Sequence, residues 1–248
     1  MARNEYDAIF FDLDGTLLPL ELQDFLDTYF DVLAKAAIRH GYEPATFSRA
    51  VGVSVGAMAQ HEPGILNSDA FWERFEAEWG SAGAKEQAFF EEFYASDFNE
   101  IGAAVRPNPA AARAIDTLRA KGYPLYLTTM PMFPREAVEW RLRWANVDPS
   151  VFRVITCYDN STACKPNLHY YWENVRRAGV DPQRILMVGN NTEEDLAVLE
   201  LGMDVFLVTD HLLNPNGFDI ASVRHGTLEE FACFAESLPR CASQCSGE

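Results

Sequence analysis

The sequence predicts an α/β protein with a doubly wound, mainly parallel sheet and an inserted all-helical domain. Two observations predict this fold. Along most of the chain, short apolar segments of β-prone residues alternate with amphipathic helical segments, the pattern of a parallel sheet covered by helices on both faces. One long stretch, residues 20–105, breaks this alternation, because it holds several amphipathic segments and no convincing strand.

The first strand is predicted at residues 6–11, where "YDAIFF" is mostly apolar, as a strand buried on both faces must be. The helix at 107–121 opens with prolines and ends before Gly122, which are favourable start and stop signals. The remaining elements follow in the same way. Strands are predicted at 123–129, 151–156, 184–189 and 204–209, and helices at 134–146, 168–178 and 193–201.

These elements divide the chain into two domains. Residues 1–19 and 106–240 form the α/β core, and residues 20–105 form the helical insertion, whose amphipathic segments lie at 22–41, 69–80 and 86–98. The polar C-terminal segment, 241–248, is predicted to be disordered.

The charge of the chain excludes some classes of partner. Its 20 Lys and Arg residues against 37 Asp and Glu residues give a formal net charge of −17, which opposes nonspecific binding to nucleic acid. No apolar run approaches the roughly 18 residues that suggest a membrane span. The N-terminal segment places carboxylates where a signal peptide needs its apolar region, so we expect a cytoplasmic protein that binds neither nucleic acid nor membranes.

Polar residues follow several of the predicted strands. Because ligands of open α/β sheets bind outside the carboxyl ends of the strands, we expect these residues to converge at one edge of the sheet. They are Asp12, Asp14, Gly15 and Thr16, then Thr128 and Thr129, then Lys165, and finally Asn190, Asn191 and Asp195. Carboxylates, a hydroxyl and a lysine together suit a hard cation beside a phosphoryl group.

The motifs "FDLDGT", "LTT", "CKPN" and "GNNTEED" match, in order and spacing, those of the haloacid dehalogenase superfamily of phosphohydrolases and phosphotransferases, which this chain resembles over nearly its whole length. The resemblance implies a Rossmann-like core. It also implies that the helical insertion is a C1-type cap, since only 35 residues separate Thr129 from Lys165 and leave little room for the other cap type.

The resemblance also implies a role for each motif. Asp12 is expected to attack phosphorus and form an aspartyl-phosphate, and Asp14 to act as general acid and base. Thr129 is expected to bind a phosphoryl oxygen, with Thr128 the weaker candidate, and Lys165 to neutralise charge. Gly15 allows the tight turn behind the carboxylates.

A magnesium ion is implied as cofactor, held by Asp12, the carbonyl of Asp14 and the later acidic motif. In that motif the family usually has two carboxylates four residues apart, and here those places are Asn191 and Asp195. An amide binds Mg²⁺ more weakly than a carboxylate. Asn191 also suits a helix N-cap, with Glu194 at the third helical position, and the two roles are compatible.

The loop "TTMPMFPRE" directly follows the phosphate-site threonine. Two interpretations stay open: Met130 and its neighbours contact the leaving group, or the loop only begins the next helix.

The sequence thus predicts a Mg²⁺-dependent phosphatase acting on a small phosphorylated metabolite. The presence of Asp14 favours phosphoryl transfer over dehalogenation, because a halide leaves without a proton. Two alternatives remain, a phosphomutase of the same superfamily and a non-catalytic protein that binds a phosphorylated ligand or a partner.

Overall fold

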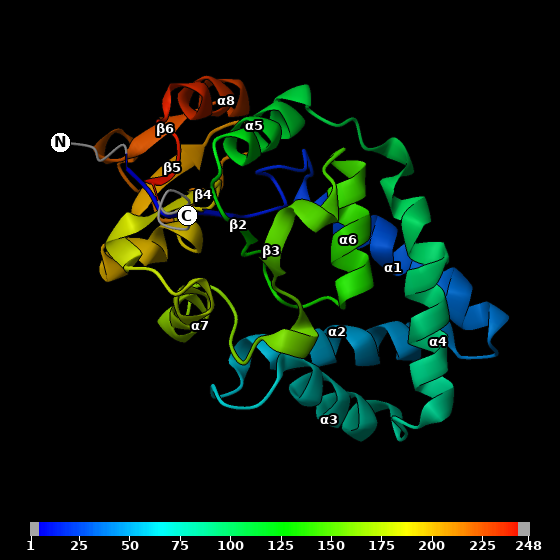
Figure 1. Ribbon diagram of the computed structural model, residues 1–248. Coiled ribbons are helices and arrows are strands. Elements are labelled where there is room, and N and C mark those ends of the chain that lie inside the picture. Colours follow the sequence, from blue (N-terminus) through cyan, green and yellow to red (C-terminus); the bar gives the residue numbers. More distant parts are fainter. Residues whose placement is uncertain (1–4, 243–248) are drawn as a thin grey trace.

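The computed structural model describes residues 5–242, which form a six-stranded parallel sheet with helices on both faces and a helical domain beside it (Figure 1). The strand order is β3-β2-β1-β4-β5-β6. The strands are β1 (Ala8–Phe11), β2 (Leu125–Leu127), β3 (Phe152–Ile155), β4 (Ile185–Gly189), β5 (Asp204–Val208) and β6 (Arg224–Gly226). The predicted doubly wound α/β fold with a helical insertion is confirmed.

The sheet is covered on both faces because successive side chains of a strand point to opposite sides. In β1, Ile9 and Phe11 pack with α5 (Pro109–Ala120) and α8 (Leu228–Ser237), whereas Ala8 and Phe10 pack with α7 (Leu168–Ala178). Figure 1 shows α5 and α8 together on one side of the strands and α7 on the other. All four residues of β1 are fully buried, which explains its unbroken apolar sequence.

The topology places the carboxyl ends of β1 and β4 at the centre of the molecule. The chain runs from β1 outward through β2 to β3, then returns to the other side of β1 to begin β4. A crevice opens where the strand order reverses in this way, and it is the usual ligand site of open α/β sheets. Asp12 follows β1 and Asn190 follows β4, so both lie at this reversal.

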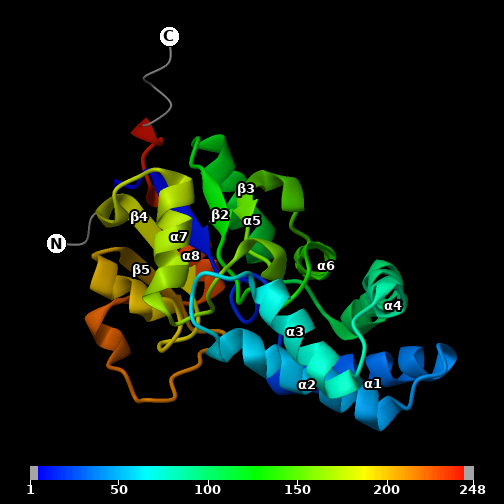
Figure 2. The same cartoon turned by 90° about the horizontal axis from the view of Figure 1, so that it is seen from below.

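The helical domain is inserted between β1 and α5 and packs around an aromatic core. Its helices are α1 (Leu22–Arg39), α2 (Pro44–Gln60), α3 (Asn67–Trp79), α4 (Ala84–Ala95) and the 3₁₀ helix η1 (Asp97–Ala104). Phe47, Phe75, Phe89 and Phe93 are fully buried there, and Phe47 contacts both Phe75 and Phe89 edge to face. Figure 2 shows these helices gathered to one side of the core, with α6 (Arg135–Trp144) between them and the sheet.

Some elements differ from those predicted. Residues 193–201 form a turn and the 3₁₀ helix η5 (Asp195–Leu201), not a full α-helix, because Asp195 folds back to the end of β4. Helices α2 and α8 and strand β6 lie in segments for which no element was predicted. The remaining 3₁₀ helices are η2 (Pro149–Val151), η3 (Tyr158–Asn160), η4 (Pro182–Arg184) and η6 (Ile220–Ser222).

The predicted disordered segment begins with a buried residue. Cys241 is 3% exposed, and its backbone N–H donates to Lys121 O at 2.9 Å. Residues 243–248 of that segment lie outside the described residues. Within residues 5–242, no helix is long and apolar enough to cross a membrane.

Candidate active site

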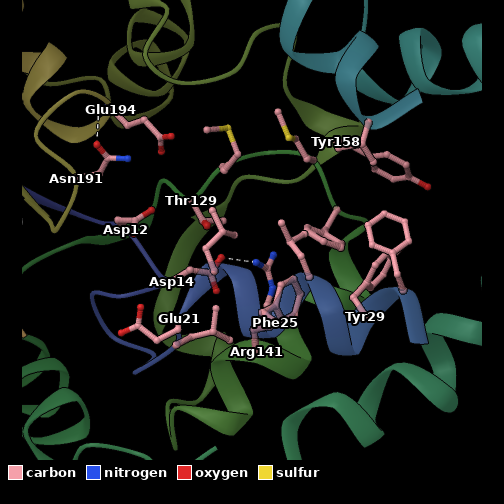
Figure 3. A pocket seen from close by; sticks show the side chains of 18 of the residues that line it. Asp12, Asp14, Glu21, Phe25, Tyr29, Thr129, Arg141, Tyr158, Asn191 and Glu194 are labelled. Atoms are coloured by element: carbon pink, nitrogen blue, oxygen red, sulfur yellow. Dashed lines mark hydrogen bonds and ion pairs between the residues drawn. The ribbon is translucent and has the colours of Figure 1, made fainter. Parts of the chain in front are cut away.

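A cavity of about 440 Å³ lies between the carboxyl ends of the central strands and the helical domain. Asp12, Asp14, Thr129 and Asn190 line it at the sheet end. Figure 3 shows the carboxylates of Asp12, Asp14 and Glu194 at one end of the cavity, and aromatic rings, among them Tyr29, at the other. Of the polar residues predicted to converge from distant motifs, Asp12, Asp14, Thr129, Asn190 and Asn191 therefore line this cavity.

Lys165 joins two carboxylates at the floor of the site. Its ammonium group donates to Asp12 Oδ1 at 2.7 Å and to Asp195 Oδ1 at 2.6 Å, and its side chain is fully buried. Burial alone would lower the pKa of Lys165, but the charges of Asp12 and Asp195 outweigh it and raise that pKa well above its usual value. Lys165 is therefore a fixed positive charge that holds the Asp12 carboxylate in place.

The turn after β1 brings a glycine and a hydroxyl against Asn190. Gly15 has φ +78°, and a Cβ there would lie 2.2 Å from Asn190 Nδ2, so both backbone and space require glycine. Thr16 Oγ1 lies 3.2 Å from Asp12 Oδ2 and 3.1 Å from Asn190 Oδ1. A hydroxyl has a single proton, so it satisfies only one of these two oxygens at a time.

The two adjacent threonines after β2 point in different directions. Thr129 lines the cavity, and its hydroxyl is buried without a hydrogen-bond partner among the described residues. Thr128 instead donates from its hydroxyl to Phe11 O at 3.3 Å, within the sheet. The carbonyl of Thr129 accepts from the hydroxyls of Thr156 and Tyr170, which fixes this register. Thr129 is thus positioned to bind a ligand, and Thr128 is not.

Asp14 is paired with an arginine from α6. Arg141 donates from Nη1 to Asp14 Oδ2, and its guanidinium group lies 4.6 Å from the centre of the Phe133 ring. Burial raises the pKa of Asp14, although the charge of Arg141 opposes the shift. Asp14 Oδ1 and Arg141 Nη2 are buried and have no partner in the described part of the chain. Asp14 is thus a buried carboxyl with a raised pKa and one oxygen without a partner at the cavity.

Asp195 closes the turn after β4. Its Oδ2 accepts from the backbone N–H groups of Asn190 at 2.9 Å and Asn191 at 3.0 Å. A Cβ on Gly189 would lie 2.2 Å from this oxygen, so the carboxylate reaches the strand end only because residue 189 is glycine. With Lys165 on its other oxygen, Asp195 has both oxygens engaged.

The side chain of Asn191 caps its own turn. Its Oδ1 accepts from the backbone N–H groups of Glu193 at 3.0 Å and Glu194 at 3.3 Å, and Figure 3 marks the second of these bonds. Asn190 is placed differently: its amide donates to His211 O at 2.6 Å and its oxygen faces Thr16 and Asp12. Of the two asparagines, Asn190 therefore presents its oxygen to the Thr16 hydroxyl that also contacts Asp12.

Glu194 is a further carboxyl at the cavity. Burial raises the pKa of its side chain to about 7, and the nearby positive charge of Lys165 only partly offsets this. Its carboxylate makes neither a hydrogen bond nor an ion pair with residues 5–242.

The fit of the site to a magnesium ion depends on oxygen atoms that remain free. Within the described chain, no three His, Cys, Asp or Glu side chains form a ready-made metal cluster. Magnesium needs fewer protein ligands, since it retains waters and takes oxygens from a bound phosphate. Asp12 Oδ2 and Asn190 Oδ1 share the one Thr16 proton, so one of them always has an unoccupied lone pair. This donor set fits a sparse magnesium shell.

The predicted residues fall into two groups. The structure brings Asp12, Asp14, Gly15, Thr129 and Lys165 together, and Met130 lines the cavity beyond them. The other group, Thr128, Asn191 and Asp195, lies close by with its oxygens bound to the protein itself. Magnesium ligation by Asn191 and Asp195 stays a prediction, and the geometry favours Asn190 over both.

Arg141 was not singled out from the sequence, although the pattern of its helix contains a signal. The buried residues of α6 are Ala137, Val138, Arg141 and Leu142, so a charged residue occupies the apolar face at helical spacing. A fully buried charge needs a partner. That partner, Asp14, lies 127 residues away in sequence and could not be identified without the fold.

Comparison with known proteins gives one family. The family model described as "haloacid dehalogenase-like hydrolase" matches residues 6–201. A glyceraldehyde 3-phosphate phosphatase of Methanothermobacter thermautotrophicus is 28% identical over 129 residues, which cover 49% of this chain and 56% of that protein. The chain thus matches only about half the length of this relative.

Solved structures share the fold at low sequence identity. A HAD phosphatase from Thermococcus onnurineus superposes with a TM-score of 0.57 at 19% identity, covering 94% of this chain and 99% of the other. A 2-haloacid dehalogenase from Pseudomonas syringae pv. Tomato DC3000 gives a TM-score of 0.59 at 18% identity, covering 92% and 97%. These two structures are similar to this chain to nearly the same degree and show the fold alone, so the chemistry must be argued from the site.

Proposed function

Because the chain belongs to the haloacid dehalogenase-like hydrolase family, we propose that it is a phosphatase that hydrolyses a small phosphate monoester through an aspartyl-phosphate on Asp12. The observation that carries this proposal is the pairing of two unlike carboxyl groups at one cavity. Asp12 is paired with the buried ammonium group of Lys165, whereas Asp14 keeps one oxygen without a partner at the cavity and burial raises its pKa. Two carboxyls in such different surroundings suit a nucleophile and a general acid.

In the proposed first step, a carboxylate oxygen of Asp12 attacks phosphorus and the bond from phosphorus to the ester oxygen breaks. Asp14 gives its proton to the departing oxygen, so the leaving group departs as a neutral alcohol. The proton is placed on Oδ1 of Asp14, the oxygen left free by Arg141. Thr129 donates its unpartnered hydroxyl to a phosphoryl oxygen, and Lys165 offsets the negative charge that gathers there.

In the second step, the Asp14 carboxylate takes a proton from water, which attacks the phosphorus of the aspartyl-phosphate. The bond between phosphorus and the Asp12 oxygen breaks, and inorganic phosphate and the free carboxylate are regenerated. Asp14 thereby recovers the proton it gave up in the first step.

The proposal includes a magnesium ion, on which this family generally depends. The Asp12 carboxylate, the Asp14 carbonyl and the Asn190 amide oxygen would hold the ion, which when bound supplies positive charge to the phosphoryl oxygens. With one carboxylate among three protein oxygens, we expect weak binding.

The test is the hydrolysis of an aryl phosphate and of a panel of small phosphate monoesters, with Mg²⁺ and with EDTA. Wild type and Asp12→Asn are compared, with Asp116→Asn on the exposed surface of α5 as the matched control. We expect turnover in wild type and Asp116→Asn that is lost in Asp12→Asn, together with a phosphorylated Asp12 trapped by rapid acid quench. Tight binding of esters without turnover in wild type would instead support the non-catalytic alternative.

A further inference from the structure

The wall that the helical domain contributes to the cavity is apolar. Among the described residues that line the cavity, those from Leu22 to Tyr94 are aliphatic, aromatic or glycine, and none is charged. They include Phe71 and Trp72 of α3 and Val55 of α2. The only side-chain polar atoms on this wall beyond the Trp72 ring nitrogen are the hydroxyls of Tyr29 and Tyr94, which bond to each other at 3.0 Å.

The charged groups that line the cavity are all at its other end. Asp12, Asp14, Arg141 and Glu194 come from the α/β core, and Figure 3 shows the three carboxylates apart from the aromatic rings of Tyr29 and Tyr158. Glu21, which belongs to the helical domain and precedes α1, also lines this end and is paired with His211 at 2.7 Å. Arg141, the one fixed cation lining the cavity in the described chain, is already paired with Asp14.

From this division we propose that the leaving group of the substrate is an apolar alcohol, aromatic or branched aliphatic, with no second anionic group. The proposal rests on the proposed phosphatase function, because it describes the group from which phosphate is removed. A polyhydroxylated or anionic leaving group would give up its hydrogen bonds with water and find on the apolar wall only the hydroxyls of Tyr29 and Tyr94, which already bond to each other. An aromatic ring would instead bury its surface against Phe71, Trp72 and Val55.

The buried polar atoms at the sheet end of the cavity are also consistent with an apolar leaving group. Thr129 Oγ1, Asp14 Oδ1 and Arg141 Nη2 are the buried unpartnered atoms there, and the first two are used by the phosphoryl group and the ester oxygen. Of these three buried atoms, Arg141 Nη2 is left for the part of the leaving group next to phosphorus, and the Glu194 carboxyl also lines this end of the cavity. The cavity volume of about 440 Å³ lies within the range of roughly 300–1,000 Å³ that small-molecule pockets occupy.

Helix α2 offers a matched pair of positions with which to test the apolar wall. Gly52 lines the cavity, and a Cβ there would lie 3.7 Å from Phe30 Cζ, at ordinary contact distance. Gly56, one turn later in the same helix, does not line the cavity and has no atom within 4 Å of such a Cβ. Gly52→Leu therefore fills part of the cavity, whereas Gly56→Leu makes the same chemical change outside it, and both favour the helix.

The experiment compares 2-phenylethyl phosphate with glycerol 1-phosphate. Both are esters of primary alcohols, so the reacting bond is the same and only the body of the leaving group differs. Dissociation constants are measured by calorimetry on the Asp12→Asn protein, alone and combined with Gly52→Leu or Gly56→Leu. Turnover by wild type is measured separately, so a failure of the phosphatase proposal appears there and leaves the binding comparison intact.

We expect the Asp12→Asn protein to bind 2-phenylethyl phosphate at least about tenfold more tightly than glycerol 1-phosphate, the gain from burying an aromatic ring. Gly52→Leu should remove most of this preference by weakening only the aromatic ester, and Gly56→Leu should preserve it. Equal binding of the two esters, or tighter binding of glycerol 1-phosphate, overturns the proposal. So does a preference that Gly52→Leu leaves unchanged.

Discussion

At the scale of single residues, the side chains of the two adjacent asparagines after β4 have different hydrogen-bond partners, which the local sequence does not reveal. The spacing to Asp195 favoured Asn191 as the metal ligand, but its oxygen binds the backbone of its own turn. Asn190 reaches Thr16 instead, and its amide is held by the carbonyl of His211, 21 residues later. A contact with a residue so distant in sequence determines which asparagine faces Thr16, so the local spacing could not predict it.

The first prediction concerns Asn190→Asp, with Asn191→Asp as the matched control. A carboxylate at 190 is a stronger magnesium ligand than the amide, so Mg²⁺ affinity should rise at least about tenfold. In EDTA the same variant should be less stable by roughly 1–3 kcal/mol, because the hydrogen bond to His211 O is lost. Calorimetric titration with Mg²⁺ and thermal unfolding in EDTA measure the two effects.

Asn191→Asp adds the same charge one residue away, and its carboxylate can still accept from the turn, so neither quantity should change appreciably. Equal gains in Mg²⁺ affinity for the two variants would contradict the assignment of Asn190.

The second prediction concerns the pH dependence that Glu194 gives to stability. Its pKa is raised from 4.5 to about 7 by burial, so between these values the folded protein keeps a proton that the unfolded chain releases. Stability should therefore fall as pH rises through this window, by an amount on the order of 2 kcal/mol. Glu194→Gln, neutral at every pH, should lose this dependence and be the more stable protein at pH 8.

Urea unfolding in EDTA at pH 5 and pH 8 measures this difference. Glu193→Gln, at the exposed neighbouring position, is the control and should behave like wild type. The idea fails if wild type and Glu194→Gln lose the same stability between the two pH values.

At the scale of elements, strands β1 to β5 were predictable because each is a short, mostly apolar run, and of these only β3 lies at an edge of the sheet. Helix α2 was not, since Gly52, Gly56 and three valines lower its helix propensity. It forms because Phe47, Ala50, Val51 and other residues at helical spacing are buried. Whether such a segment forms a helix depends on its tertiary packing, which a short stretch of sequence does not reveal.

Helix α8 was also missed, although its start contains a local signal. Thr227 Oγ1 accepts from the backbone N–H of Glu230 at 3.2 Å, and Glu230 Oε2 accepts from the backbone N–H of Thr227 at 2.7 Å. This reciprocal pair is a capping box. It starts the helix whose Phe231 packs against Phe11 and Phe206 on one face of the sheet.

The third prediction follows for Thr227→Ala. Loss of the cap should lower the free energy of unfolding by about 1 kcal/mol, as measured by urea unfolding. Phosphatase activity should stay the same, because no residue of α8 lines the cavity in the described structure. Thr117→Ala, inside α5 and without a side-chain hydrogen bond to the described residues, is the control and should cost nothing. A loss of activity without a loss of stability would show that α8 acts on the site.

At the scale of the whole molecule, the site needs both domains, because the core supplies the charged end of the cavity and the helical domain its apolar wall. Direct contacts hold the two together. Trp144 of α6 stacks on Phe98 of η1 with ring centres 5.3 Å apart, and Trp140 donates to Tyr94 O at 3.1 Å. These contacts join residues far apart in sequence, so the relative placement of the domains could not be predicted from it.

Asn67, at the start of α3, is the buried polar link on the other side. It is fully buried, and its amide donates to Pro131 O at 3.0 Å while its Oδ1 lies 2.8 Å from His61 Nε2. Its backbone N–H donates to Ser161 O at 2.9 Å. One side chain thus ties the helix that carries Phe71 and Trp72 to the loop that follows Thr129.

The last prediction is that Asn67→Ala weakens both stability and substrate binding. The freed carbonyl of Pro131 and the space left behind should cost about 2 kcal/mol in urea unfolding. With α3 less firmly placed, its share of the apolar wall is less well ordered, so KM should rise several-fold while kcat changes little. Ser68→Ala is the control, since this neighbouring buried hydroxyl forms no hydrogen bond with the described residues. A KM that stays unchanged in a destabilised Asn67→Ala protein would mean that Asn67 supports the fold without shaping the cavity.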